Sequence, residues 1–243
     1  MESLKKQTVH SNILLVTSTP NEWIETLSQN YDIPVFVNHG EGGITQDWNF
    51  GLSRVNTRYA TIAHQDDTYE PDYLERILEN MDHEKTPIIA FSDYSELRDG
   101  EKVHDTRMLQ IKRIMLAPLK IRMFWKSRFV RRRILSFGDP ICCPSVTFCL
   151  DNLEQPIFRN GFRSCEDWEA WEKLSRLKGS YIYVPKPLMC HRIHEESATT
   201  AIIQDNARAE ENYIMYRKFW PAGIAKRING LYNTSEKSNS LKH

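Results

Sequence analysis

The stretch Tyr59-Ala60-Thr61-Ile62-Ala63-His64-Gln65-Asp66-Asp67 decides how this chain folds, because an apolar run ends in two adjacent carboxylates. The run predicts a buried strand ending at His64, and the segment 71–81 after it predicts a helix. Buried carboxylates are costly unless a positive group meets them, and the C-terminal ends of parallel strands are where α/β sheets bind ligands. The sequence therefore favours a divalent cation carrying a diphosphate. The alternative is an acidic turn that complements the dipole of the following helix.

Short apolar runs alternate with helix-compatible segments on both sides of this stretch. Strands are predicted at 13–16, 34–37, 59–64 and 87–91, and helices from about 19, at 44–55 and at 71–81. This alternation predicts an α/β, three-layer fold with a mainly parallel central sheet. It breaks after about residue 100, where the expected elements are a helical region at 108–135, strands at 145–149 and 181–184, and helices at 164–177 and 202–219.

Composition sets broad limits on the protein. The chain has 243 residues and is 40% hydrophobic, which is ordinary for a soluble domain. The formal net charge is zero, so overall charge favours no class of partner. The cysteine count is odd and the first residues are polar, so we expect free thiols in a reducing cytoplasm. No apolar stretch reaches the roughly 20 residues that a membrane span needs.

A glycine-containing loop precedes the predicted helix at 44–55. Gly42 and Gly43 would let backbone approach a ligand closely. Asn49 would lie about two turns into the helix, where its amide could brace the loops above the sheet. The alternative is a flexible surface turn followed by an ordinary polar helix residue.

Two motifs in the second half carry groups suited to catalysis. At 164–168, Ser164 would cap a helix, and Glu166 and Asp167 would favour the dipole of its first turn. A carboxylate held there could also accept a proton from a hydroxyl group. At 191–194, an extended backbone would put Arg192 and His194 on one face, where they suit a diphosphate leaving group. A pair of surface side chains is the alternative.

The segment 107–133 contains many Lys and Arg residues and no Asp or Glu, interleaved with apolar residues. Such a segment can lie on an anionic membrane surface. The alternative is a solvated helix pair that covers one edge of the sheet. No module known to bind nucleic acid is recognisable, so nucleic acid is not an expected partner.

The order of these motifs resembles that of the family 2 glycosyltransferases of the GT-A fold, of bacterial type. The matching motifs, in chain order, are ITQDWNFGL, YATIAHQDD, YEPDYLERIL, CCPSVTF, FRSCEDWEAWEKLSRL and YIYVPKPLMCHRIHEESATT. The resemblance covers roughly residues 12–200 and is more specific jointly than any single motif.

The resemblance implies an inverting, metal-dependent transfer of a sugar from a nucleoside-diphosphate sugar to a hydroxyl of a saccharide or lipid-linked saccharide in surface polysaccharide synthesis. Asp167 falls at the position of the catalytic base, with Glu166 in support. Asp66 and Asp67 occupy the DXD-like position for Mn²⁺ or Mg²⁺, with Asp67 the better direct ligand. The full set is completed by His194 as a further metal ligand and by Thr17, Ser18, Asn38, Gly43, Asn49, Asp66 and Arg192 for the nucleotide sugar.

The chain departs from the family pattern before the acidic motif. The family usually has more chain there and often ends its second strand in an Asp-rich turn that reads the base, whereas this chain has Asn38-His39-Gly40-Glu41. One alternative is therefore a non-catalytic nucleotide-sugar-binding or scaffold protein that kept the fold. Another is a nucleotidyltransferase, which shares a similar sheet and a metal-bound nucleotide. The second of these should have a glycine-rich basic loop after the first strand, and 17–21 contains none.

The expected organisation is one domain over residues 1–233. Within it, about 12–100 would bind the nucleotide sugar, about 101–200 would hold the acceptor and the catalytic groups, and 201–233 would form C-terminal helices. Residues 234–243 would be a flexible tail. The expected location is cytoplasmic, at the inner face of the plasma membrane if the basic segment contacts lipid.

Overall fold

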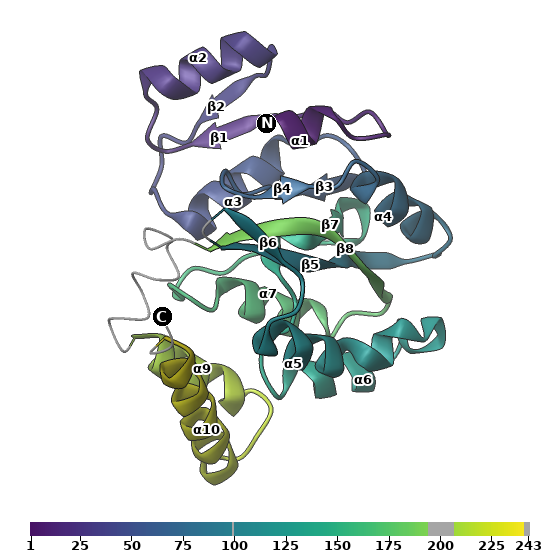
Figure 1. Ribbon diagram of the computed structural model, residues 1–243, viewed down its shortest axis with the longest axis vertical. Coiled ribbons are helices and arrows are strands. Elements are labelled where there is room, and N and C mark those ends of the chain that lie inside the picture. The colour runs from purple at the N-terminus through teal and green to yellow at the C-terminus, as the bar shows by residue number, and fades with distance from the viewer. Residues whose placement is uncertain (99, 194–206, 241–243) are drawn as a thin grey trace.

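The computed structural model describes residues 1–98, 100–193 and 207–240, with no account of the side chains of 207 and 233–240. The described strands form a small sheet and a large sheet (Figure 1). The large sheet has the order β3-β7-β5-β8-β4, with β6 on β5. The strands are β1 Leu15–Thr17, β2 Val35–Val37, β3 Tyr59–Thr61, β4 Thr68–Tyr69, β5 Pro87–Arg98, β6 Glu101–Val103, β7 Val146–Cys149 and β8 Ser180–Ile193.

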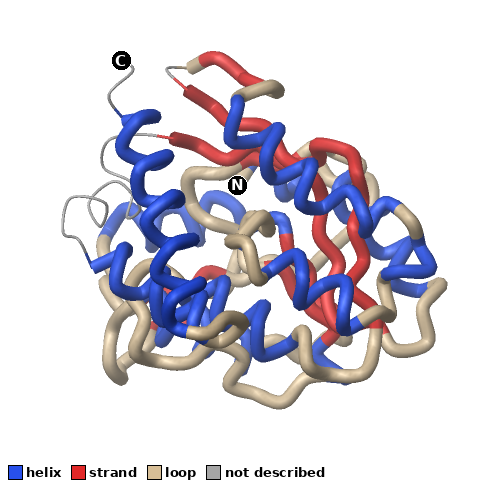
Figure 2. The backbone as a smooth tube through the Cα atoms, turned by 90° about the horizontal axis from the view of Figure 1, so that it is seen from below, coloured by secondary structure: helices blue, strands red, loops and turns tan. Residues whose placement is uncertain are grey.

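Helices lie on both sides of the large sheet. Figure 1 shows α3 and α4 on one side and α5, α6 and α7 on the other, with α9 and α10 beyond them. In the view from below, helices cross much of that second face (Figure 2). The α-helices are α1 Glu2–Lys5, α2 Glu22–Tyr31, α3 Ile44–Arg54, α4 Tyr73–Asp82, α5 Arg107–Leu116, α6 Arg128–Leu135, α7 Glu166–Leu174, α9 Ala207–Arg217 and α10 Ala222–Ser240; the 3-10 turns are η1 Ala117–Lys120, η2 Arg122–Phe124, η3 Cys143–Ser145 and η4 Leu150–Asn152.

The predicted α/β architecture is confirmed, but the sheet is mixed rather than mainly parallel. Only β1–β2 and β5–β8 pair in parallel among the described strands. The pairs β3–β7, β5–β7, β4–β8 and β5–β6 are antiparallel. The cause is the helical region between β6 and β7, which brings the chain back so that β7 enters between β3 and β5 in the opposite direction.

The local sequence explains where several helices begin. Asn21 accepts a hydrogen bond from the Ile24 backbone N–H and caps α2, and Thr106 does the same for α5 through Leu109. Pro118 lies in η1, just after α5, as expected of a residue that cannot continue a helix. The boundary predicted at 234 falls inside α10, which continues to Ser240.

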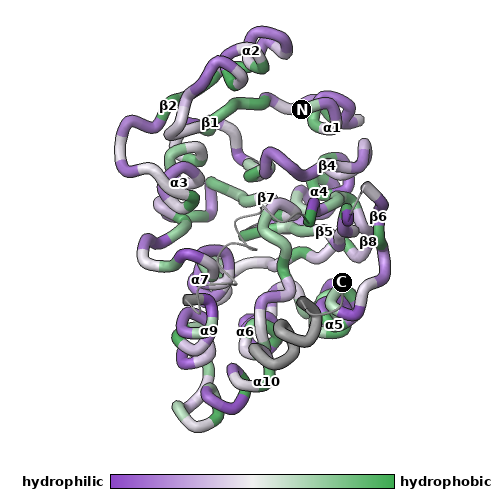
Figure 3. Tube along the Cα trace, turned by 60° about the vertical axis from the view of Figure 1, so that its left-hand side comes forward, coloured by the Kyte–Doolittle hydropathy of each residue, from purple (hydrophilic) through white to green (hydrophobic). Residues whose placement is uncertain are grey.

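The hydrophobic core lies around β5 and β8. Both strands are much longer than the apolar runs predicted at 87–91 and 181–184, because polar residues extend them in a shared parallel ladder. Ile89, Phe91 and Tyr181 are fully buried, and α4 presents Ile77 and Met81 to the same core. Figure 3 shows hydrophobic segments around β5 and β7, whereas α2 is mostly hydrophilic. Among the described residues, no helix combines the length and apolarity required to cross a bilayer.

Candidate active site

The acidic turn 64–67 lies against the end of β8. β4 follows the turn and pairs with β8, so Thr68 lies opposite Cys190. This pairing puts Asp67 beside residues more than a hundred positions later in the chain. Its Oδ1 accepts a hydrogen bond from the Arg192 backbone N–H at 2.9 Å and lies 2.9 Å from the His191 Nδ1 atom. The Arg192 guanidinium donates to the Asp66 carbonyl at 3.1 Å, which ties the two segments together.

The turn contains a group of side chains that fits a divalent cation. Ligand atoms of His64, Asp66 and Asp67 all lie within 4.8 Å of one another. Asp67 Oδ2 and His64 Nε2 are buried and have no hydrogen-bond partner among the described residues. Burial lowers the pKa of His64, which favours the neutral imidazole that can coordinate a metal. Carboxylate oxygens beside a neutral imidazole make this group a candidate site for a divalent cation.

Helix α7 carries Glu166 and Asp167 in its first turn. Trp171 is fully buried in the core, and the Trp168 indole N–H donates to the Leu135 carbonyl at 3.1 Å, so the helix is firmly anchored. The predicted Ser164 cap is wrong, because the Ser164 hydroxyl and backbone N–H both donate to Glu211 of α9. The residue at the N-cap position is Cys165. Helix α9 therefore fixes the loop that delivers the two acids.

Burial changes the pKa of both acids of α7. Asp167 Oδ1 accepts a hydrogen bond from the Trp168 backbone N–H at 2.8 Å, which favours the charged form. Burial opposes this and raises the pKa of Asp167 above its ordinary value. Glu166 is 7% exposed, and burial raises its pKa to about 7. The first turn of α7 thus holds two carboxyl groups whose raised pKa values suit proton transfer.

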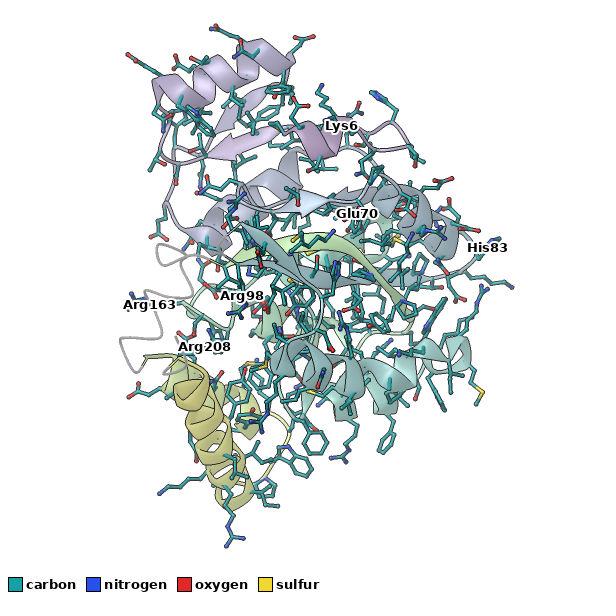
Figure 4. All side chains as sticks on the ribbon, in the orientation of Figure 1. Lys6, Glu70, His83, Arg98, Arg163 and Arg208 are labelled. Atoms are coloured by element: carbon teal, nitrogen blue, oxygen red, sulfur yellow. The ribbon has the colours of Figure 1, made fainter. Side chains whose placement is uncertain are left out.

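One cleft of about 2730 Å³ connects the two acidic regions. Asp67 and Asp167 both line it, although they are far apart in the sequence. Arg98, Arg163 and Arg208 also line it, and they lie toward the left of Figure 4. The cleft therefore combines carboxylates with cations from three further segments, an arrangement suited to a ligand that carries phosphates.

A polar cluster holds together the loops at the N-terminal end of the cleft. Asp47, in the first turn of α3, accepts hydrogen bonds from the Ser18 hydroxyl at 2.7 Å and from the Asn38 amide at 2.8 Å. The Thr17 hydroxyl accepts from the Thr19 backbone N–H at 3.0 Å. Gly43 is the N-cap of α3 and has φ +145°, a value that side-chain-bearing residues rarely adopt. These contacts join β1, β2 and α3.

A sequence comparison identifies the family. The sequence model described as "Glycosyl transferase family 2" matches residues 2–152, more than half of the chain. The chain belongs to glycosyl transferase family 2. A comparison with curated protein sequences found no match. The acidic turn lies inside the matched region of this glycosyltransferase, whereas Asp167 lies beyond it.

Solved structures show that the glycosyltransferase has the GT-A fold. The crystal structure of S. aureus TarS 1-349 is similar with a TM-score of 0.59 at 13% identity, over 99% of this chain and 69% of that chain. The mannosyltransferase PcManGT from Pyrobaculum calidifontis, solved in complex with GDP-Man and Mn²⁺, has a TM-score of 0.61 at 14% identity, over 96% and 65%. This chain spans about two thirds of the length of either relative.

The glycosyltransferase structure brings most of the predicted site residues together. Those that line the cleft are Thr17, Ser18, Gly43, Asp66, Asp67, Glu166, Asp167 and Arg192. Asn49, predicted to contact the nucleotide sugar, is not among the lining residues, because its amide exchanges two hydrogen bonds with the Phe158 backbone and braces that loop. Asn38 contributes indirectly through Asp47. His194 lies outside the described residues.

Two histidines of the site were not predicted as functional residues. His64 belongs to the quoted motif, and its spacing of three residues from Asp67 was the available signal. His191 contacts Asp67 only because β4 pairs with β8. No local pattern could reveal that pairing, since the two residues come from distant parts of the chain.

Proposed function

We propose that this glycosyltransferase is an inverting, divalent-metal-dependent enzyme that transfers a sugar from a nucleoside-diphosphate sugar to a hydroxyl of a saccharide or lipid-linked saccharide, in surface polysaccharide synthesis. One observation carries the proposal. Asp67, whose buried Oδ2 accepts no hydrogen bond from the described residues, and Asp167, at the start of α7, line the same cleft from separate halves of the sequence. A donor held at the first and an acceptor at the second would meet between them.

Each residue then has a chemical role. Asp167 accepts the proton of the acceptor hydroxyl, whose oxygen attacks the anomeric carbon while the bond to the diphosphate breaks. The diphosphate leaves with the bonding electrons, and the Arg192 guanidinium at the rim stabilises its charge. Asp66, Asp67 and His64 would hold Mn²⁺ or Mg²⁺, which supplies further positive charge to the diphosphate. In this assignment the metal ligands include His64, and the role of His194 stays a prediction.

The N-terminal part of the cleft would hold the nucleoside. Thr17, Ser18 and Gly43 line that part, and Asp47 sits among them. Residues about 12–100 would thus contact the donor, while about 101–200 would carry the acceptor and the base. Glu166, largely buried with a raised pKa, would orient the acceptor or support Asp167.

Two substitutions test the assignment. Asp167→Asn should abolish sugar transfer and leave nucleotide binding intact, because it removes the base and keeps the shape. Asp67→Asn should lose Mn²⁺ binding and metal-dependent nucleotide binding. Paramagnetic resonance titration with Mn²⁺ alone measures Mn²⁺ binding. Calorimetry with UDP, GDP and dTDP, each with and without Mn²⁺, measures nucleotide binding. GDP-Man is the first donor to assay, since a mannosyltransferase of this fold binds it.

Asp151→Asn is the matched control. Its side chain is 65% exposed, faces Arg58 at 3.7 Å and is not among the residues that line the cleft. This variant should keep transfer and Mn²⁺ binding. Full transfer by Asp167→Asn would overturn the assigned base, and unchanged Mn²⁺ affinity in Asp67→Asn would overturn the metal site. Absence of binding by every nucleotide would favour a non-catalytic scaffold.

We also propose that 107–133 contacts an anionic membrane from the cytoplasmic side. Ile114, Met123 and Phe129 are 73%, 75% and 72% exposed, an unusual degree for large apolar side chains. Exposed cations such as Lys120 and Arg133 accompany them, although Glu84 pairs with Arg122 and Lys126. Apolar side chains beside cations suit an anionic lipid surface.

Sedimentation with vesicles tests this contact. Binding to phosphatidylglycerol vesicles should exceed binding to phosphatidylcholine vesicles and should weaken as salt rises. Replacing Ile114, Met123 and Phe129 together by Ser should lower it at least tenfold. Trp23→Ser, which removes a 65% exposed side chain on α2, is the control and should change nothing. Equal binding by the triple variant and the wild type would contradict the contact.

A further inference from the structure

Asp139 brings a second carboxyl group to the proposed base. It lies in the loop Gly138-Asp139-Pro140 that follows α6, and its carboxyl group is within hydrogen-bonding reach of Asp167. Asp139 Oδ1 accepts from the Ile141 backbone N–H at 3.1 Å, and Asp167 Oδ1 accepts from the Trp168 backbone N–H at 2.8 Å. One oxygen of each carboxyl group is therefore fixed by backbone. Both residues line the cleft.

This contact requires a proton. Two charged carboxylates have no hydrogen to share and repel each other, so a hydrogen bond between them needs one neutral partner. Burial, and then the neighbouring Asp167, raise the pKa of Asp139 well above its ordinary value. Four groups lower the pKa of Asp167 and so favour its charged form: the Trp168 N–H, Lys112, Arg208 and Asp139 itself. We therefore assign the shared proton of the pair to Asp139, since Asp167 has the Trp168 N–H and the two cations to favour its charged form.

Groups from several elements surround the pair. Lys112 of α5 donates to the Tyr94 hydroxyl of β5 at 2.9 Å and acts electrostatically on both acids. Arg208 of α9 adds a second positive charge that acts on Asp167. These two cations stabilise the single negative charge that the pair of carboxyl groups carries. The other titratable groups that interact electrostatically with one or both acids are His64, Cys142, Cys143, Cys165, Glu166 and Tyr181.

We propose that Asp139 is a positioning residue for the transfer reaction: its neutral carboxyl group donates a hydrogen bond to the Asp167 carboxylate and holds it toward the acceptor hydroxyl. The inference rests on the proposed role of Asp167 as the base. During transfer Asp167 takes the acceptor proton while Asp139 keeps its own, so the hydrogen bond can persist with both groups neutral. Asp139 itself forms no bond to substrate.

Two variants at Asp139 distinguish a role in positioning the Asp167 carboxylate from a merely structural role. Asp139→Asn keeps a donor to Asp167 and should retain kcat within about threefold of wild type. Asp139→Ala removes the donor and should lower kcat at least tenfold near neutral pH. Loss of a hydrogen bond to the charged form raises the pKa of Asp167, so the acidic limb of the kcat profile should move to higher pH in Asp139→Ala alone. Asp105→Ala, at a 69% exposed site, is the control.

The protonation of the two carboxyl groups can also be measured when the protein transfers no sugar under the chosen conditions. Carboxyl carbon resonances of labelled Asp should show one buried carboxyl group that stays protonated well above the ordinary range, and Asp167→Asn should shift its titration. If Asp139 titrates normally, or if Asp139→Asn and Asp139→Ala lose kcat equally with unmoved acidic limbs, the inference is overturned. Full transfer by Asp167→Asn would instead overturn the proposed base.

Discussion

The N-terminal layer and the central sheet of this glycosyltransferase are built very differently. The layer of β1, α2 and β2 has two strands of three residues each, and α2 contains no buried residue. In the central sheet, Ile88, Ile89, Ala90 and Phe91 of β5 are at most 1% exposed, and β8 pairs with β5 along most of its length. Figure 1 shows the layer at the top and the sheet in the middle.

This contrast matches the proposed roles of the two regions, with the catalytic acids on the central sheet and α7 and the nucleoside at the N-terminal layer. Asp67 is fixed to β8, and Asp167 is fixed to a helix whose tryptophans are buried in the core. Proton transfer and metal binding need geometry held to fractions of an ångström. The nucleoside end of the cleft depends on the thin layer and on the Asp47 cluster. We expect the acids to be rigid and the donor side to be adaptable. Three predictions compare the two regions, and a fourth tests the burial of one of the acids.

The largest expected difference concerns two phenylalanines on strands. Phe91 on β5 is fully buried and stacks on Tyr183 with ring centroids 5.3 Å apart, so Phe91→Ala should cost about 3–5 kcal/mol of the free energy of unfolding. Phe36 on β2 is only half-buried, so Phe36→Ala should cost about 1–2 kcal/mol. Urea titrations of both variants measure the difference. Equal costs would mean that the N-terminal layer is packed as firmly as the central sheet.

Two glycines with nearly the same backbone angle give the second test. A Cβ on Gly179, φ +142°, would lie 2.5 Å from the Thr86 carbonyl oxygen, whereas on Gly43, φ +145°, it would meet the flexible end of Gln46. Gly179→Ala should therefore cost about 3 kcal/mol and Gly43→Ala about 1 kcal/mol, since only the first clashes with backbone. Thermal unfolding of both variants measures these costs. A larger loss in Gly43→Ala would reverse the comparison.

The third prediction concerns the pH dependence of stability at Glu166. Its pKa is raised from the ordinary 4.5 to about 7 in the folded protein, so the folded state binds the proton more tightly than the unfolded state. Its contribution to stability is therefore full below pH 4.5 and is lost as pH rises toward 7. Glu166→Gln cannot ionise, so its stability relative to wild type should increase by roughly 2–3 kcal/mol between pH 5 and pH 8. Denaturant titrations at both pH values would show this, and a constant difference would contradict it.

The same contrast explains how much of the fold could be predicted from sequence. The alternation of apolar runs and helix-compatible segments predicted α3 and α4 within two residues of their observed bounds. The lengths of β5 and β8 could not be predicted, because Ser95 and Glu96 are polar and their burial depends on a neighbouring strand far along the chain. Ser164 is a residue type that often caps helices, but its hydroxyl donates to Glu211 of α9 instead. Tertiary partners override local propensity at each of these places.

The candidate site was predictable where its residues are local in sequence. Asp66 and Asp67 follow an apolar run, and Glu166 and Asp167 begin an amphipathic helix, so residue type and position were sufficient to single them out. Asp139 and His191 gave no such signal. Asp139 reads as part of a Gly-Asp-Pro turn, and only the packing of α6 against α7 brings its loop to Asp167. Long-range contacts of this kind require the folded chain.

The smallest expected effect is at the cluster that holds the N-terminal layer to α3. Asp47→Ala removes the acceptor for Ser18 and Asn38 and should cost about 1 kcal/mol, because both partners can turn to water. The loss should be local: amide exchange of the Asn38 N–H, bonded to the Thr17 carbonyl at 2.8 Å, should quicken about fivefold, while β5 amides stay unchanged. Thr26→Ala, on the exposed side of α2, is the control. If exchange in β5 accelerated equally, the two regions would open as one cooperative unit, and the donor side could not adapt independently of the acids.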